Sequence, residues 1–371
     1  MAGIYIHIPF CKSRCIYCGF YSTTSLERRR AYVDALVREL EKRKDYLWDE
    51  RIDTIYFGGG TPSLLPPEEV ERILSSLFYI YNVREDAEIT LEANPDDVSF
   101  SLLEAWRHMG VNRLSMGVQT FDNQRLQFLH RRHTAEQAIR AVQMAQQAGF
   151  TNISIDLMFG FPNQTLEEWG SDVQKALSLQ VQHLSAYSLM YEDGTHLHRM
   201  LQRGDIHELD EETSLQMYGH LIDALTAAGY QHYELSNFAL PQMQSRHNSS
   251  YWHGIPYLGV GAGAHSYDGH TRCYHPDSLN DYLSNATLVI EELTEKERYD
   301  EYVFTGLRTA EGIRLDLLEK QFGITFKTYC LQNAQKHIDA GRLVLHNQVL
   351  HLSRSGLFVS NDIMSDLMWV E

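Results

Sequence analysis

Short apolar segments with the two-residue alternation of β-strands recur along the first half of the chain, and segments with helical spacing separate them. The predicted strands cover residues 3–9, 52–57, 88–92, 113–118, 152–158 and 183–188. The predicted helices cover residues 26–47, a segment that begins at Pro67, and residues 101–109, 134–148 and 166–179. Strands that alternate with helices predict an α/β fold with a parallel sheet and helical crossovers. A closed barrel of eight such units takes about 250 residues, so six units in roughly the first 190 predict an open (β/α)6 partial barrel.

Beyond the sixth strand the pattern changes. A helix is predicted over residues 210–228 and a short strand over 230–234, and residues 236–275, with many Gly, His and Tyr, are expected to be loop-rich. The last part of the chain has helical spacing over residues 295–307, 315–322 and 326–340, followed by a hairpin over 342–352. Helices followed by a hairpin are typical of a winged-helix-like α+β module. We therefore predict a barrel over residues 1–235, a loop-rich connector over 236–290 and a C-terminal winged-helix-like domain over 291–371.

Composition and charge exclude several classes of function. The 371 residues are 43% hydrophobic, as expected for a globular core, and carry a formal net charge of −17. Residues 290–371 contain 13 acidic and 9 basic side chains, so neither the chain nor its winged-helix-like part favours nucleic acid as a partner. No apolar segment is long enough to span a membrane, and we expect no signal peptide. Five cysteines, three of them in one loop, fit a reducing cytoplasm.

Three cysteines follow the first strand in a C-x3-C-x2-C spacing: Cys11, Cys15 and Cys18. Three thiolates on one tight loop can hold three irons of a [4Fe-4S] cluster and leave the fourth iron open to an outside ligand. The alternative is a zinc site in which His7 is the fourth ligand. The loop by itself leaves both interpretations open.

Polar or glycine residues recur where the predicted parallel strands end, which is where βα barrels bind their ligands. Residues 58–60 are three glycines that allow a close approach of the backbone to a ligand, and Thr61 adds a hydroxyl. Glu92 ends the third strand, and Asp156 lies within the fifth, where a charge is costly unless it is paired or faces the site. The alternative for both carboxylates is a structural ion pair.

These features together resemble the HemN/HemW branch of the radical S-adenosylmethionine (SAM) family, over nearly the whole chain. The matching segments are the cysteine loop with Tyr17 and residues 5–11, 58–62, 91–95, 117–119 and 155–157. The resemblance implies a radical SAM barrel with a HemN-type C-terminal domain, and a [4Fe-4S] cluster whose open iron binds the amino and carboxylate groups of SAM. The SAM-binding residues that it implies are Tyr5, Tyr17, Gly59, Gly60, Thr61, Glu92, Gln119, Arg131 and Asp156.

The branch contains two functions, and three features separate them. The oxygen-independent coproporphyrinogen III dehydrogenases carry a further Cys two residues after the third ligand, where this chain has Phe20, and a long extension before the first strand. The heme chaperones carry an HNxxYW motif, which this chain has over residues 247–252. The resemblance therefore favours a heme chaperone that delivers heme to an acceptor protein, with the dehydrogenase as the alternative. Whether SAM is cleaved, and hence whether the protein is an enzyme, stays open.

The motif has a physical interpretation as a heme site. A neutral imidazole such as that of His247 is a common axial ligand of heme iron, and Tyr251 and Trp252 offer flat faces to a porphyrin. Arg246 can pair with a propionate. The alternative is a loop whose aromatic side chains pack on the barrel while the histidine faces solvent.

The sequence leaves open which residue ligates the heme iron, which protein accepts the heme and which oligomeric state the chain adopts. His253 and Cys273 are further candidates for the iron ligand. In the HemN relatives a Gly-rich stretch, here residues 258–266, lines the SAM pocket, so His265 is expected either to face the ligands or to be a core histidine. The resemblance suggests a respiratory heme protein as acceptor and a homodimer coupled to the cluster, and it allows contact with a membrane surface.

Overall fold

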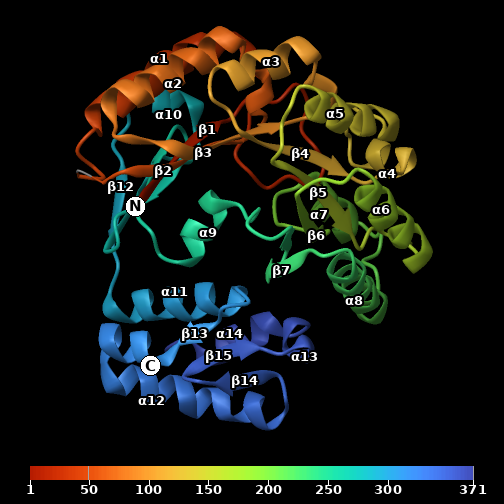
Figure 1. The fold of residues 1–371 in the computed structure, drawn as a ribbon, viewed down its shortest axis with the longest axis vertical. Coiled ribbons are helices and arrows are strands. Elements are labelled where there is room, and N and C mark those ends of the chain that lie inside the picture. Colours follow the sequence, from red (N-terminus) through yellow and green to blue (C-terminus); the bar gives the residue numbers. More distant parts are fainter. Residues whose placement is uncertain (49, 371) are drawn as a thin grey trace.

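The computed structural model describes residues 1–48 and 50–370, and its largest element is an open twelve-stranded sheet (Figure 1). Six strands run parallel and lie side by side in the order of the sequence. They are β1 (Ala2–Ile8), β2 (Ile52–Gly59), β3 (Val83–Ala93), β4 (Arg113–Gln119), β5 (Ile153–Phe159) and β6 (His183–Ser188). The predicted open barrel of six βα units is therefore confirmed.

The helices that connect these strands cover one face of the sheet (Figure 1). They are α1 (Arg29–Lys42), α2 (Pro67–Ile80), α3 (Phe100–His108), α4 (Asn123–Phe128), α5 (Ala135–Gln147) and α6 (Leu166–Ser178). Thr134 and Thr165 begin α5 and α6 with capping boxes, in which the threonine hydroxyl accepts from the third backbone N–H and the third side chain accepts from the threonine N–H. The short helix α4 escaped prediction because six residues are too few to establish a helical period.

The sheet continues beyond the parallel strands at both edges. On one side β9 (Tyr257–Val260) pairs in parallel with β1, and β10 (His265–Tyr267), β11 (Thr271–Tyr274) and β12 (Val289–Glu292) follow antiparallel. On the other side β8 (Asn237–Ala239) and β7 (Gln231–Glu234) extend the sheet from β6. Residues 236–275, expected to be loop-rich, contain four short strands and the helix α9 (Arg246–Trp252), with loops between these elements. Strands of three or four residues show no recognisable alternation.

The C-terminal residues form a second unit with its own hydrophobic core. Its elements are α11 (Glu295–Arg308), β13 (Ile313–Arg314), α12 (Leu315–Asp339), β14 (Leu343–His346), β15 (Val349–Leu352), α13 (Arg354–Leu357) and α14 (Ser360–Leu367). Tyr299, Phe322 and Ile363 lie in its core. Gly323, with φ of 85°, interrupts α12 between the two helices predicted from the sequence. The predicted helices-then-hairpin order is present, while the boundaries at residues 235 and 290 stay predictions.

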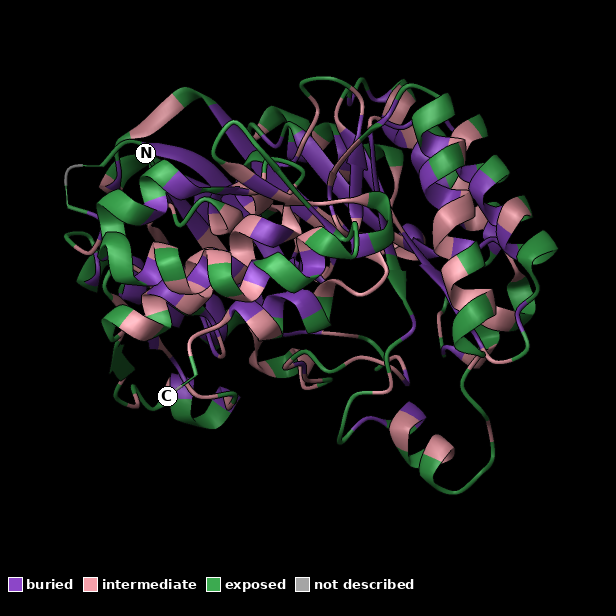
Figure 2. Ribbon diagram, turned by 90° about the horizontal axis from the view of Figure 1, so that it is seen from below, coloured by how far each residue is buried: buried purple, intermediate pink, exposed green. Residues whose placement is uncertain are grey.

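Burial follows the layers of the fold. The strands of the barrel are almost entirely buried, whereas each helix alternates between a buried inner side and an exposed outer side (Figure 2). Trp106 on α3 and Trp169 on α6 are the largest fully buried side chains in the described part of the chain. The remaining helices around the barrel are α7 (His196–Gln202), α8 (Glu211–Ala227) and α10 (Leu279–Leu283).

A buried carboxylate, Glu39 on α1, joins this helix to the segment that follows β8. It accepts hydrogen bonds from Tyr282 Oη at 2.7 Å and from the N–H of Gly261 at 3.1 Å. It also forms ion pairs with Arg43 at 3.2 Å and with His275 at 3.0 Å. Burial disfavours its charge, but the donors, His275 first, lower the pKa of Glu39 below its ordinary value. The charged form therefore stabilises the fold.

We predict that Glu39→Gln lowers the free energy of unfolding by about 3 kcal/mol at pH 7, because the variant leaves the buried cation of Arg43 without its partner. A lowered pKa means that the contribution is present above the ordinary value of 4.5 and is lost as the pH falls through the folded-state pKa. Urea unfolding followed by near-ultraviolet circular dichroism measures both effects. Glu41→Gln, at an exposed position of the same helix, is the control. Equal stability of the two variants would contradict the assignment.

Candidate cluster and cofactor site

The cysteine loop leaves β1 at the edge of the sheet where the parallel strands end. Two backbone hydrogen bonds fix its start, from the N–H of Cys11 to the carbonyl of Thr23 at 2.9 Å and from the N–H of Thr23 to the carbonyl of Pro9 at 2.7 Å. Cys11, Cys15 and Cys18 line one cavity of ≈ 520 Å³ at this edge. The loop predicted to carry the cluster therefore opens onto the ligand side of the barrel.

The zinc alternative requires His7 as a fourth ligand beside the three thiols. Among residues 1–48 and 50–370, no group of three or more Cys, His, Asp or Glu side chains surrounds one point as the ligands of one ion. His7 is engaged elsewhere, since its ring nitrogens lie 3.1 Å from Tyr5 Oη and 3.1 Å from the carbonyl oxygen of Tyr21. A cubane cluster binds each cysteine at a different iron, so thiols spread around a cavity fit it.

Hydrogen bonds and burial act in opposite directions on the thiols of the cysteine loop. Thr61 Oγ1 donates to Cys11 Sγ at 3.4 Å, and Arg131 Nη1 donates to Cys15 Sγ at 3.6 Å. Burial raises the pKa of the Cys18 thiol to about 11 and also raises that of Cys11. Thiolates in such a place need positive charge beside them, which the irons of a cluster provide.

The glycines after β2 let the backbone approach the cysteine loop. Gly59 has a φ of 109°, and a Cβ atom there would lie 2.5 Å from the His7 ring. A Cβ at Gly60 would lie 2.8 Å from the backbone of Pro9 and 3.0 Å from Cys11 Sγ. A side chain at Gly60 would therefore push the cysteine loop away from the end of β2, and one at Gly59 would collide with the His7 ring of β1.

Two partly buried carboxylates, Glu92 and Asp156, face the cavity from β3 and β5. Glu92 accepts hydrogen bonds from Tyr56 Oη at 2.7 Å and from the N–H of Gly59 at 3.2 Å, and burial raises its pKa to about 7. Burial raises the pKa of Asp156 to about 6, although a hydrogen bond with Ser185 opposes the shift. Both groups therefore change protonation close to neutral pH, and their charged forms favour a cationic or hydroxyl-bearing ligand.

Arg131 and Gln119 complete the cavity from the side of β4. Arg131 Nη2 donates to Asn94 Oδ1 at 2.7 Å and to the carbonyl of Gly117 at 2.6 Å. Gln119 has a φ of 70°, which is rare for a residue other than glycine, and it lies where the register between β4 and β5 shifts. Such irregularities are concentrated at functional sites because they redirect a side chain.

The cavity brings together all but one of the residues predicted to bind SAM. Those that line it are Tyr17, Gly59, Gly60, Thr61, Glu92, Gln119, Arg131 and Asp156. Tyr5 is not among the lining residues. Its ring lies inside the barrel, 6.1 Å from the ring of Tyr56 and 6.3 Å from that of His247. In this structure Tyr5 therefore packs behind the residues that line the cavity and does not line it itself.

Sequence reasoning missed two residues that shape the cavity. Asn94 joins Arg131 to Thr61, to whose hydroxyl its amide donates at 3.4 Å. Tyr56 holds Glu92. The signal for Asn94 was its place in the segment 91–95. Tyr56 gave no signal, because a tyrosine within a strand is commonly a packing residue.

The motif histidine, His247, is a buried residue of the barrel interior. Its Nδ1 lies 2.7 Å from Thr54 Oγ1 and its Nε2 lies 2.8 Å from Tyr251 Oη. Its ring stacks on Tyr56 with the centroids 5.0 Å apart, and burial lowers its pKa to about 3. With both nitrogens engaged, it presents no free lone pair to heme iron, so the geometry does not support the hypothesis that His247 is the axial ligand.

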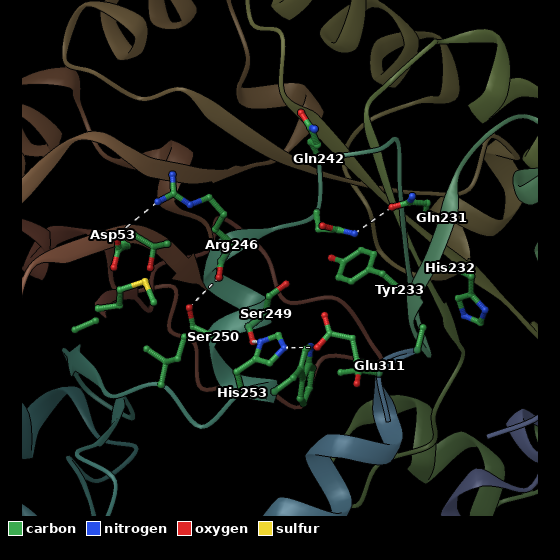
Figure 3. Close-up of a pocket in the computed structure, with 18 residues that line it drawn as sticks. Asp53, Gln231, His232, Tyr233, Gln242, Arg246, Ser249, Ser250, His253 and Glu311 are labelled. Atoms are coloured by element: carbon green, nitrogen blue, oxygen red, sulfur yellow. Dashed lines mark hydrogen bonds and ion pairs between the residues drawn. The ribbon is translucent and has the colours of Figure 1, made fainter. Parts of the chain in front are cut away.

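Three other residues of the motif helix, Arg246, Tyr251 and Trp252, line two cavities that are separate from the cluster cavity. Arg246 and Trp252 line a cavity of ≈ 550 Å³, in which Arg246 Nη2 lies 3.8 Å from Asp53 (Figure 3). Tyr251 and Trp252 also line a larger groove of ≈ 1320 Å³ between α9, β9–β11 and the C-terminal unit. The motif is therefore on a helix, and not on the loop expected from the sequence.

Two further candidate residues, Cys273 and His265, line neither the cluster cavity nor the groove. Cys273 is buried, and its sulfur accepts a hydrogen bond from Arg43 Nη2 at 3.1 Å. His265 stacks on Tyr274 with the ring centroids 4.5 Å apart and is not among the residues that line the cluster cavity. Neither residue faces the cluster or the groove in this structure.

Comparison with known proteins agrees with this geometry. The family described as the Radical SAM superfamily matches residues 5–176, and the HemN C-terminal domain matches residues 293–359. A solved structure of coproporphyrinogen III oxidase (HemN) from Escherichia coli superposes with a TM-score of 0.87 over 99% of this chain and 90% of that one, and at 24% identity it shows the fold. An open parallel barrel with three cysteines at its ligand edge defines the radical SAM class.

Relatives of known name that match nearly the whole chain narrow its assignment within the radical SAM superfamily. The protein named heme chaperone HemW from Lactococcus lactis is 35% identical over 98% of this chain and 96% of its own length. The protein of the same name from Bacillus subtilis is 33% identical over 98% of both. A Bos taurus relative named radical S-adenosyl methionine domain-containing protein 1, mitochondrial, is 35% identical over 99% of this chain and 87% of its own length. The chain belongs to the HemW family of radical SAM proteins.

We predict that Cys15→Ser abolishes the iron–sulfur cluster and leaves a folded chain, because the loop lies at the edge of the barrel and outside its core. Iron and sulfide analysis after anaerobic reconstitution, with circular dichroism as the test of folding, measures this. Ser13→Ala, an exposed change in the same loop, is the matched control and should retain the cluster. Full iron and sulfide in the Cys15 variant would remove the ligand assignment.

We also predict that SAM affinity increases as the pH rises through about 7, because Glu92 then becomes a carboxylate, which accepts hydrogen bonds from the ribose hydroxyls of SAM more strongly than the protonated acid does. Glu92→Gln should weaken SAM binding about tenfold at pH 8 and flatten this pH dependence. Anaerobic titration calorimetry of the reconstituted protein between pH 6 and pH 8 tests both effects. Glu104→Gln, at an exposed position on α3, should behave as the wild type. A Glu92 variant that keeps the wild-type profile would exclude Glu92 as the group responsible.

Proposed function

We propose that this chain is a heme chaperone that holds a [4Fe-4S] cluster and SAM, binds heme and delivers it to an acceptor protein. The observation that carries this proposal is the identity of 33–35% over nearly the full length to relatives named heme chaperone HemW. The HNxxYW motif supports it, because the motif forms a helix of its own, away from the cluster cavity. Its aromatic side chains border a groove large enough for a porphyrin.

In this proposal each group of residues that lines the cluster cavity binds a different part of the cluster or of SAM. Cys11, Cys15 and Cys18 would hold three irons of the cluster. The backbone and hydroxyl of residues 59–61 would bind the amino group of SAM, and Glu92 would accept from its ribose hydroxyls. When bound, the cluster and SAM supply one-electron reductive chemistry. Arg131 holds Asn94 and the sulfur of Cys15, so it keeps the cysteine loop in place against the barrel.

The size of the cluster cavity bears on the alternative, a coproporphyrinogen III dehydrogenase. Such an enzyme needs its porphyrinogen beside SAM. The cavity of ≈ 520 Å³ lies within the range of about 300–1,000 Å³ that is usual for one small ligand. Phe20, which stands where the dehydrogenases have a further Cys, is 72% exposed at the mouth of the cavity.

The proposed setting is the cytoplasm, where a low-potential cluster stays reduced. None of the helices in residues 1–48 and 50–370 has the length and apolar character needed to cross a bilayer. We propose a respiratory heme protein as the acceptor, peripheral contact with the membrane where such acceptors lie, and a homodimer that depends on the cluster. The resemblance to the HemN/HemW branch supports these partners, and the formal charge of −17 speaks against nucleic acid.

One experiment separates the two functions. Anaerobically reconstituted protein receives SAM, a reductant and either heme or coproporphyrinogen III, while the Soret band and the porphyrin products are followed together. We expect a stable 1:1 heme complex and no decarboxylated product. Protoporphyrinogen formed over many turnovers would overturn the chaperone proposal in favour of the dehydrogenase. The Cys15→Ser variant is the control that shows whether any product depends on the cluster.

A further inference from the structure

The groove of ≈ 1320 Å³ is the largest of the cavities described above, and no residue of the cluster site lines it. One wall is the end of α9 with β9–β11, and the other is α11 with the start of α12. In Figure 1 the C-terminal unit lies below the barrel, with α9 at the barrel's lower side facing α11. The groove therefore lies where the two units meet.

The walls of the groove suit a flat, apolar ligand. Aromatic rings reach it from both units, and those that line it are Tyr251, Trp252, Tyr257, Tyr267, Tyr302 and Phe304. The indole Nε1 of Trp252 is buried and has no hydrogen-bond partner in the described residues. The Trp252 ring lies under the guanidinium of Arg308, whose Cζ is 4.8 Å from the ring centroid. Aromatic faces of this kind stack on planar ring systems.

The charges of the groove differ from those of the chain as a whole. Four cations and three carboxylates line it, although the full chain carries a net charge of −17. The Nε of Arg298 is buried without a partner, and within the described residues Lys320 has no ion-pair partner. Arg314 pairs with the exposed carboxylate of Asp316. These side chains can bind carboxylates carried by a ligand.

A histidine that lines both the groove and the cavity of ≈ 550 Å³ is oriented like a metal ligand. His253 follows α9, and its Nδ1 donates to the carbonyl of Ser249 at 2.7 Å, because a carbonyl can only accept. This bond fixes the tautomer in which Nε2 carries the lone pair of the neutral ring. Nε2 faces the carboxylate of Glu311 at 3.0 Å (Figure 3). Both side chains of this ion pair are exposed, so the pair is weak and easily displaced.

From these contacts we propose that the groove is the heme site and that Nε2 of His253 is the axial ligand of the iron. The proposal rests on the proposed function and deepens it by placing its ligand. On binding, iron takes the place of Glu311 at Nε2, and the proton of this pair passes to solvent. The aromatic rings enclose the macrocycle, and Arg298 and Lys320 bind its propionates.

In this arrangement His247 is a positioning residue of the motif. It hydrogen-bonds to Tyr251, which lines the groove, and to Thr54 in the barrel, so it fixes how α9 is seated. The groove and the cysteine loop lie at opposite ends of β1, whose seven residues span about 23 Å. Heme in the groove is therefore a cargo held away from SAM, and not a substrate beside it.

The test compares heme titrations of the intact wild-type protein and of His253→Ala, each followed by the Soret band and by electron paramagnetic resonance of ferric heme. We expect His253→Ala to weaken heme binding about tenfold or more and to remove the imidazole-ligated signal, while the cluster content stays the same. His346→Ala changes an exposed histidine of the C-terminal hairpin and is the matched control. Glu311→Gln, which removes the competing carboxylate, should bind heme at least as tightly as the wild type.

The outcomes distinguish the two proposals. A wild-type Soret band and affinity in His253→Ala would overturn the heme site proposed here and leave the chaperone function standing. Absence of heme binding by the wild type itself would overturn the proposed function. Arg298→Ala combined with Lys320→Ala should weaken binding of heme more than that of its dimethyl ester. An equal loss for both ligands would contradict the role of these cations in binding the propionates.

Discussion

The parallel pairing of β1 with β2 is the constraint on which the site depends. In its register His7 lies opposite Gly58 and Ile8 opposite Gly59, so the segments that follow the two strands must leave the sheet side by side. One carries the cysteines and the other the glycine turn. Because every parallel strand needs a crossover back to its starting end, the strands β3 and β5 bring Glu92 and Asp156 to the same edge.

Burial then sets the electrostatics of that edge. It raises the pKa of two carboxylates and of the Cys11 and Cys18 thiols, and in the described residues Arg131 is the cation that contacts both the cysteine loop and the barrel. Groups of this kind cost free energy when they are charged and alone. Irons and a sulfonium ligand supply the missing positive charge, so binding of the cluster and of SAM stabilises the charged forms that hold them.

The opposite end of the barrel is closed by the motif helix. Thr54 near the start of β2 and Tyr251 on α9 engage both nitrogens of His247, and Tyr56 stacks on its ring. Tyr56 also donates to Glu92, so one short chain of contacts joins the cofactor cavity to the helix that borders the groove. The motif thus couples two regions of the molecule through packing.

The sequence by itself determined the six βα units, the cluster loop and most of the cofactor cavity. Strands β1–β6 are long enough to show their alternation, the three cysteines lie within eight residues, and the parallel topology fixes where the strand ends meet. Only the tertiary structure decided that residues 246–252 form a helix, that His247 is buried, and that His253 faces Glu311 across 58 positions of the chain. These facts depend on contacts between segments that are distant in sequence. A side chain's exposure is set by what packs against it, and no local pattern carries that information.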